Sequence, residues 1–225
     1  MINFTKKKTK KVKQEEIEEE SSSEEEQTKT KAVTLAELIQ GKEADTPESR
    51  SIMFVGEVTE EKAAELISAM IVLAQTKEEE EDERSEDIKI YVNTYGGSAD
   101  EMFAIYDTMN WCKQFCDIQT IGLGKVMSAG TLILAAGTKG KRYISPHCRV
   151  MIHSVNGGHI GELHNLKNEL EQMADLQDKY IQSLSSETNM TKRQIESLIN
   201  KKINIYLNAE ETVEKGLADE VWNGR

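Results

Sequence analysis

The sequence predicts an α/β domain whose sheet is largely parallel. Short apolar runs alternate with segments of helical period over residues 51–222. This alternation is typical of strands and helices that succeed one another along the chain, with the helices covering a parallel sheet. The alternation has no fixed period, which argues against a repeat protein. The length of 225 residues allows one such domain with additional tails.

Residues 1–49 are predicted to be a disordered charged tail and linker. A basic block over residues 6–11 precedes an acidic block over residues 15–26. Blocks of this kind bury too little apolar surface to offset the entropy lost on ordering. A short amphipathic helix is expected over residues 32–40, and the folded domain over residues 50–225. The tail fits either a solubilising extension or a segment that docks on a partner.

The first half of the domain contains two predicted strand and helix pairs. An apolar strand over residues 51–56 precedes a helix over residues 59–74, and a strand over residues 88–92 precedes a helix that ends at Gln114. Between the pairs, residues 77–86 form a charge run with an acidic excess. Such a run is typical of a solvated helix end or loop.

The second half follows the same rules, with one unusually long helix. The elements predicted there are a strand at 118–123, a buried helix at 131–136, strands at 142–144 and 149–152, helices at 163–184 and 191–199, a strand at 203–207 and a helix at 208–214. In the long helix, apolar residues recur every three or four positions and define one face. Its predicted length is about 35 Å at 1.5 Å per residue, so it overruns an ordinary domain edge. A partner surface is therefore expected on it, although packing within its own domain is the alternative.

Ser128 lies where a predicted strand meets a predicted helix. A hydroxyl at such a turn projects away from both the strand and the helix. It lies next to the N–H groups at the start of the helix, which favour negative charge. The simplest function of a serine at this position is to cap the helix. The second notable site is Gly96-Gly97, which comes a few residues after the predicted strand at 88–92. Two glycines allow a tight turn, but they also allow a backbone N–H to face a cleft as an oxyanion donor.

Composition excludes several classes of function. The net charge of −12 opposes broad nucleic-acid binding, because phosphate would be repelled. No apolar run is long enough to span a membrane, and the basic N-terminus lacks the apolar segment of a signal peptide. The three cysteines match no zinc spacing, so we expect buried reduced thiols, no metal and a cytoplasmic location. His147, His159 and His164 have no spaced ligand partners and are expected at the surface.

An ordered set of short segments resembles the proteolytic subunits of the caseinolytic (Clp) protease family. The resemblance covers residues from about 50 to 222 and rests on Gly96-Gly97 and on residues 105–109, 128–130, 137–142, 149–153 and 157–158. It implies a crotonase-like αββ superhelix with the long helix as a protruding handle. It also implies a homo-oligomeric double ring enclosing serine active sites, polypeptide substrates, and a Clp-type AAA+ unfoldase as partner.

The resemblance also implies site residues. Ser128 falls on the nucleophile and His153 on the general base, and the N–H groups of Gly97 and Ala129 fall on the oxyanion hole. The expected reaction is acyl transfer to Ser128 followed by hydrolysis, with no metal or cofactor, and ATP used only by the partner. The third catalytic position departs from the family, because Asn204 stands where the family has aspartate. An asparagine can orient the imidazole but carries no charge, and the change from Asp to Asn costs about 10⁴ in turnover in a serine protease. Another carboxylate could substitute, but Asp219 matches a structural position.

Three other functions compete with the serine peptidase. An inactive or weakly active ring subunit is favoured by Asn204. A phage prohead-type maturation protease shares the fold family and would use the charged tail for docking. A crotonase-type acyl-CoA enzyme also uses two backbone donors, but no adenine-binding feature is visible, and Ser128 and His153 would have no role in it.

Overall fold

The computed structural model describes residues 49–76 and 85–223. The predictions for residues 1–48, and for residues 77–84 of the acidic run, therefore lie outside the described residues. The described elements are, in order, β1 (Ser51–Val58), α3 (Glu60–Gln75), β2 (Ser85–Gly97), α4 (Ala99–Cys112), β3 (Cys116–Met127), α5 (Ala129–Ala135), β4 (Arg142–Ile144), β5 (Arg149–Ile152), α6 (Leu163–Glu187), α7 (Lys192–Ile199), β6 (Ile205–Leu207), α8 (Ala209–Glu214) and β7 (Glu220–Val221).

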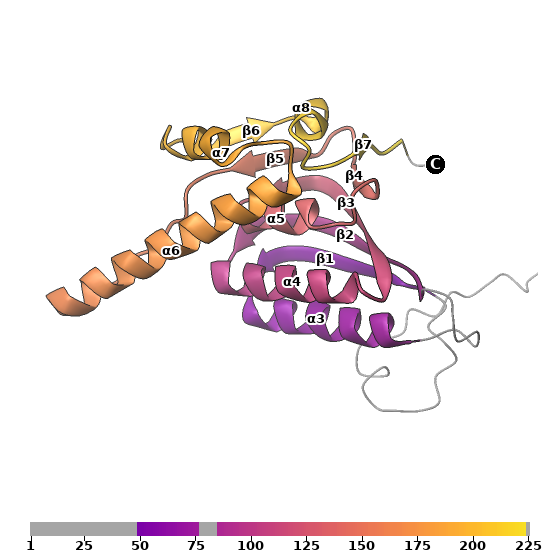
Figure 1. The fold of residues 1–225 in the computed structure, drawn as a ribbon, viewed down its shortest axis with the longest axis horizontal. Coiled ribbons are helices and arrows are strands. Elements are labelled where there is room, and N and C mark those ends of the chain that lie inside the picture. Colours follow the sequence, from indigo (N-terminus) through magenta and orange to yellow (C-terminus); the bar gives the residue numbers. More distant parts are fainter. Residues whose placement is uncertain (1–48, 77–84, 224–225) are drawn as a thin grey trace, which may run out of the picture. The chain divides into compact units, whose positions relative to one another are not determined.

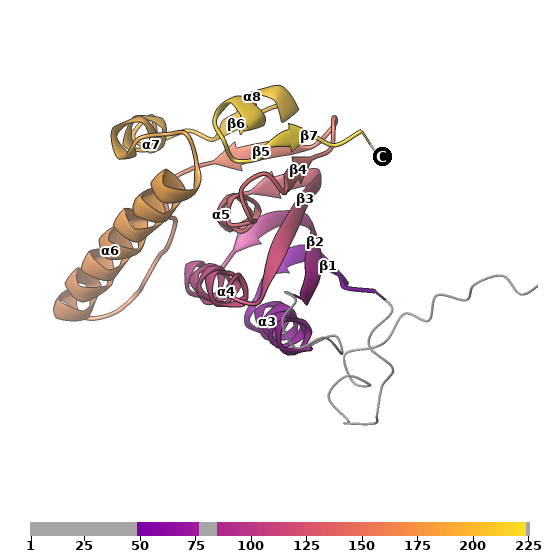
Figure 2. The ribbon, with the colours of Figure 1, turned by 45° about the vertical axis from the view of Figure 1, so that its right-hand side comes forward.

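The strands form a mainly parallel sheet, as predicted. The order β1-β2-β3-β4-β7 contains only parallel neighbours, and among the described strands the one antiparallel pair joins β5 to β6. Figures 1 and 2 show α3, α4 and α5 together on one face of this sheet. Right-handed crossovers that advance in one direction along a sheet place their helices on the same face. The other face near β1 is consequently not covered by these helices.

Strand β3 has different neighbours along its length, and this arrangement positions the candidate site. Its middle, at Thr120–Gly122, pairs with β4, while its end, at Lys125–Met127, pairs with β5. Both pairings are parallel, so the carboxyl ends of β3 and β5 lie side by side. The residues that follow Met127 and Ile152 are therefore neighbours in space.

The core lies between the sheet and the helices on its covered face. Apolar residues with no more than 2% exposure fill it from both layers: Leu66, Met70, Ile88, Ile90, Met102, Ile105, Met109, Ile118, Leu132, Ile133 and Leu134. Every residue of α5 is buried. The three cysteines are buried and are not joined in disulfides, as predicted. Helix α5 has no polar face and is therefore stable only when it is buried in this way.

Strands β2 and β3 are longer than their apolar runs indicated. Ser85 and Glu86 belong to β2, so the prediction that the acidic run stays a loop or helix end to residue 86 is wrong. Ser85 pairs with Cys116, and Thr94 pairs with Val126, so the parallel ladder extends the strands at both ends. Thr94 is fully buried, and its hydroxyl accepts a hydrogen bond from the Gly96 N–H at 2.9 Å. This bond satisfies the Thr94 hydroxyl within the core.

Helix α6 is buried only at its C-terminal end. Tyr180, Ile181 and Leu184 are buried, whereas Leu163 and Leu170 are 64% and 67% exposed. Figure 1 shows the N-terminal part of α6 extending away from α4 and α5. The apolar face predicted for this helix is therefore present, but half of it has no covering element among the described residues.

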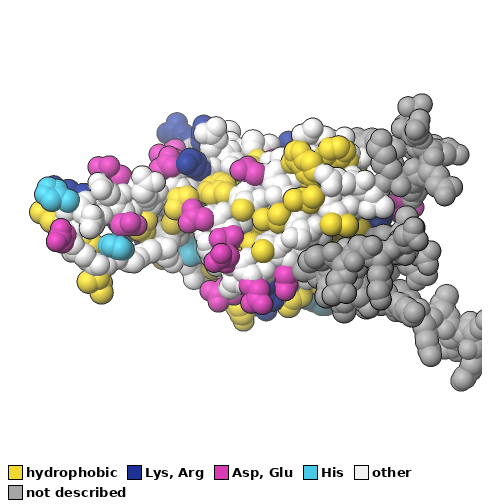
Figure 3. Space-filling view, turned by 90° about the horizontal axis from the view of Figure 1, so that it is seen from below, with side chains coloured by type: hydrophobic (Ala, Val, Ile, Leu, Met, Phe, Trp, Pro, Cys, Tyr) yellow, Lys and Arg dark blue, Asp and Glu magenta, His cyan; other side chains and the backbone are white. Residues whose placement is uncertain are grey.

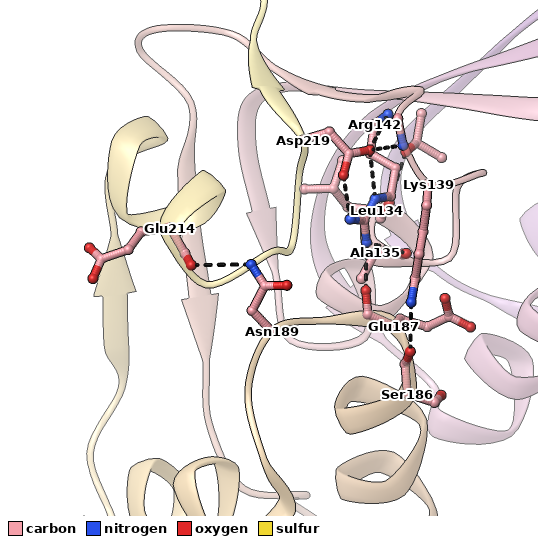
Figure 4. Close-up of polar contacts among 11 residues, drawn as sticks. Leu134, Ala135, Lys139, Arg142, Ser186, Glu187, Asn189, Glu214 and Asp219 are labelled. Carbon is pink, nitrogen blue, oxygen red and sulfur yellow. Dashed lines mark hydrogen bonds and ion pairs between the residues drawn. The ribbon is translucent and has the colours of Figure 1, made fainter.

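A buried guanidinium fixes the C-terminal end of α6 (Figure 4). Arg142 is 4% exposed, and its Nη1 donates to the carbonyl oxygens of Ala135 at 3.1 Å and Glu187 at 2.6 Å. These carbonyls end α5 and α6. Its charge is balanced by Asp219, which accepts from Nε at 2.9 Å and from Nη2 at 2.5 Å. Burial raises the pKa of the Asp219 carboxyl, but the hydrogen bonds and charge of Arg142 outweigh burial and hold the pKa below its usual range.

Candidate active site

Ser128 forms the turn between β3 and α5 in a strained conformation. Its φ of 53° and ψ of −122° are rare for a residue with a side chain, and such a conformation costs roughly 1–3 kcal/mol. Its N–H donates to the Met151 carbonyl at 2.8 Å, and its carbonyl accepts from the Thr131 N–H at 2.9 Å and the Thr131 hydroxyl at 2.7 Å. The Ser128 side chain makes no helix-capping hydrogen bond. The backbone around Ser128 is thus held while its hydroxyl is left for another partner.

That partner is His153. The Nε2 atom of His153 lies 2.7 Å from Ser128 Oγ. The β3–β5 register explains the contact, because Met127 pairs with Met151, and His153 follows β5 just as Ser128 follows β3. Burial lowers the pKa of the His153 imidazole. The imidazole therefore stays neutral, as a general base must be, at a lower pH than an ordinary histidine.

The other ring nitrogen of His153 faces an asparagine three residues further along the chain. Asn156 Nδ2 lies 3.2 Å from His153 Nδ1. With Nδ2 toward the ring, Nδ1 accepts and the ring proton is on Nε2, facing Ser128. A half-turn of the amide places Oδ1 there instead, so that Nδ1 carries the proton and the Nε2 lone pair faces the Ser128 hydroxyl. The orientation of the Asn156 amide thus selects the tautomer of His153.

Asn204 is exposed and lies directly before β6. Strand β6 runs antiparallel to β5, with Ile205 opposite Ile152. Extending this register by one residue sets Asn204 opposite His153, and directly opposed residues in an antiparallel pair share one face. Among the described residues, however, the hydrogen bond to Nδ1 comes from Asn156 and not from Asn204.

Gly97 and Ala129 lie on the same pocket as Ser128 and His153, a cavity of about 490 Å³. Ala129 is the first residue of α5, where a backbone N–H has no partner within the helix. A Cβ on Gly97 would lie 2.3 Å from the Val58 carbonyl oxygen, so only glycine fits this close approach. The two proposed oxyanion donors therefore border the pocket that the hydroxyl and imidazole share.

Gly96 is a second close neighbour of the serine. A Cβ at Gly96 would lie 2.6 Å from Ser128 Cβ and 2.8 Å from the Met127 carbonyl oxygen, and its φ is +96°. Both the space and the backbone conformation therefore require glycine. The pair Gly96-Gly97 serves two different contacts, one to the serine turn and one to β1.

The remaining wall of the pocket is mostly apolar, with Tyr95, Met102, Met151, Val155 and Tyr180 among its lining residues. Such a surface suits an apolar substrate side chain. Within residues 49–76 and 85–223, no group of three or more His, Cys, Asp and Glu side chains is placed to hold a metal ion. His147, His159 and His164 are exposed, as predicted, and Figure 3 shows histidine side chains near the free end of α6.

A family model described as Clp protease matches residues 43–225. The chain belongs to the Clp protease family. Its match covers the whole described domain, including the strand-to-helix turn at Ser128 and the strand that ends at His153. Membership supports a peptidase built on a mixed α/β fold. In the described part of this Clp-family chain, no helix is both long and apolar enough to cross a membrane.

Sequence reasoning missed Asn156 as a site residue in this Clp-family chain. The sequence predicts no role for Asn156, which directly precedes Gly157-Gly158. The available signal was position, because an asparagine three residues after the candidate base can fold back onto the base when a turn follows. The sequence likewise predicts Thr131 only as part of a buried helix. It predicts Tyr180 only as part of the apolar face of the long helix. Their hydroxyls lie 2.6 Å apart.

Proposed function

We propose that the chain is a serine endopeptidase that cleaves unfolded polypeptides by way of an acyl-enzyme. The contact of 2.7 Å between Ser128 Oγ and His153 Nε2 carries this proposal. A hydroxyl that close to a neutral imidazole, beside two candidate backbone donors, has the arrangement that acyl transfer requires.

The reaction begins when His153 Nε2 takes the hydroxyl proton of Ser128 and Oγ attacks the peptide carbonyl carbon. The Gly97 and Ala129 N–H groups stabilise the oxyanion of the tetrahedral intermediate. The intermediate collapses as His153 returns the proton to the leaving amine, which leaves an ester on Ser128. Water then attacks the ester with His153 again as base. As the bond between the acyl carbon and Ser128 Oγ breaks, His153 returns that proton to Oγ, and the carboxylic acid product departs.

Two asparagines are proposed to orient His153. Asn156 reaches Nδ1 directly, and Asn204 lies opposite His153 in the extended β5–β6 register. Either amide oxygen can accept the Nδ1 proton and so keep the Nε2 lone pair toward Ser128. Neither stabilises the imidazolium by charge, so the proposed turnover is lower than that of an enzyme with an aspartate at the position of Asn204.

The proposed assembly is a homo-oligomeric double ring joined through α6, acting in the cytoplasm with a Clp-type AAA+ unfoldase that uses ATP. Support comes from the exposed leucines of α6, since Leu163, Leu166 and Leu170 form an apolar face. In such a chamber, entry into the interior selects the substrate, and the site itself needs little selectivity. A pocket that offers mostly apolar contacts agrees with this.

The proposal is tested by peptide hydrolysis. A fluorogenic peptide with an apolar residue before the scissile bond should be cleaved by the assembled wild-type protein. Ser128→Ala and His153→Ala should each reduce cleavage to background, with the oligomer retained on size-exclusion chromatography. Equal cleavage by wild type and Ser128→Ala would contradict the proposal.

The second candidate function is an inactive ring subunit. The uncharged Asn204 at the third catalytic position favours it. An assembled ring whose Ser128 never reacts with a serine-directed reagent would establish that function instead.

A further inference from the structure

Two buried hydroxyls connect α6 to the backbone of the serine turn. The Thr131 hydroxyl and the Tyr180 hydroxyl lie 2.6 Å apart, and Thr131 Oγ1 also donates to the Ser128 carbonyl oxygen at 2.7 Å. A threonine hydroxyl has a single proton. Because Thr131 gives that proton to Ser128, it must accept from Tyr180. The chain of donation therefore runs from Tyr180 through Thr131 to the Ser128 carbonyl.

Both hydroxyls are buried, where the loss of a hydrogen-bond partner costs most. Thr131 is fully buried and Tyr180 is 4% exposed. Burial raises the pKa of the Tyr180 phenol to about 12, and the phenol therefore keeps its proton throughout the working range. Water has little access to either hydroxyl, so removal of one deprives the other of this partner.

The accepting carbonyl shares a peptide unit with a proposed oxyanion donor. The Ser128 C=O and the Ala129 N–H lie in one rigid plane and point in opposite directions. Fixing the carbonyl therefore fixes the direction of the N–H. The plane needs such support because Ser128 has a rare backbone conformation, which persists only where its surroundings determine it.

Helix α6 is a firm support for this purpose. Its final turn is clamped by Arg142, whose Nη1 also holds the end of α5 through Ala135 (Figure 4). Thr131 lies in the first turn of α5 and contacts Tyr180, so α5 is tied to α6 near both of its ends. A displacement of α6 would be transmitted to the serine turn through these two contacts.

We infer that Tyr180 and Thr131 are positioning residues that aim the Ala129 N–H at the oxyanion, and thereby link the reactivity of Ser128 to the placement of α6. This inference rests on the proposed serine chemistry. The relay acts on the transition state, because an oxyanion forms only after attack. Its loss should therefore lower kcat and leave KM nearly unchanged.

The test measures the rate of Ser128 labelling by a fluorophosphonate, together with kcat and KM for a peptide, in the full-length assembled protein. Tyr180→Phe and Thr131→Val keep the shape of each side chain and remove its hydroxyl. Each should slow labelling and lower kcat by roughly tenfold, the scale of one buried hydrogen bond that acts on a transition state. Thr131→Ser should restore both rates, and the double variant should be no slower than Thr131→Val.

A matched control separates positioning from general stability. Tyr106 also joins α6 to another helix, since its hydroxyl donates to Glu187 Oε1 at 2.9 Å. Tyr106→Phe should leave labelling and kcat unchanged. Unchanged labelling in Tyr180→Phe and Thr131→Val, or an equal loss in Tyr106→Phe, would overturn the inference. A wild-type protein that is never labelled would instead refute the serine chemistry itself, so the two failures are distinguishable.

Discussion

His153 and Ser128 meet because two parallel strands end side by side. The imidazole Nε2 lies 2.7 Å from the hydroxyl Oγ, and the Ser128 N–H donates to Met151, the residue two positions before His153 along β5. The contact is therefore fixed by backbone register and does not depend on flexible side chains alone.

The acid limb of the pH profile should lie below pH 6.5, the ordinary pKa of histidine. The base must be neutral, and burial lowers the pKa of His153, so the neutral form persists as the pH falls. The measurement is kcat/KM for a peptide from pH 5 to 9, with a parallel check that the oligomer persists. An acid limb above the ordinary histidine value would contradict the burial argument.

Replacing an orienting asparagine by aspartate should raise activity and move the acid limb upward. A carboxylate accepts from Nδ1–H, fixes the productive tautomer and stabilises the imidazolium, which raises the histidine pKa. Asn156→Asp tests the residue in contact with Nδ1, and Asn204→Asp tests the residue that register sets opposite His153. The leucine variants are the matched controls and should lower kcat. If neither aspartate changes the pH profile, neither position orients His153.

Gly96→Ala should abolish hydrolysis. Its Cβ would lie 2.6 Å from Ser128 Cβ, so the serine turn must shift. Gly140→Ala is the matched control, because Gly140 has a similar φ of +88° but nothing within 4 Å of its added Cβ. Both variants carry comparable backbone strain, and only the first disturbs Ser128. Comparable activity in the two variants would show that the serine turn tolerates the shift.

Asp219→Asn should destabilise the fold at neutral pH by about 3 kcal/mol, because it leaves the charge of buried Arg142 without its partner. The folded pKa of Asp219 lies below its unfolded value of about 3.9, so its contribution is complete above pH 4 and is lost as the pH falls through the folded value. Denaturant unfolding at pH 7 and pH 3 measures both effects. Asp175→Asn, which removes an exposed pair with Lys179, should change little. A variant as stable as wild type would refute the proposed role of the buried pair.

The sheet, its helices and the contact between Ser128 and His153 were accessible from the sequence because they follow from apolar periodicity and from an ordered set of motifs. The ends of β2 and β3 were not, since Ser85 and Thr94 are polar and are held in the strands by pairing with distant residues. Asn156 and the Tyr180–Thr131 contact were missed for a related reason. Their roles arise from a turn and from a separation of 49 positions along the chain, which local patterns do not encode.

The central claim is tested most directly by mapping a covalent adduct. The assembled protein is treated with a fluorophosphonate, digested, and analysed by mass spectrometry for the peptide that carries the label. The predicted result is a single adduct on Ser128. The adduct should be lost in His153→Ala and should form more slowly at acidic pH, where the His153 imidazole is protonated. An unmodified Ser128 in intact rings, or a label that persists at the same rate without His153, would contradict the account.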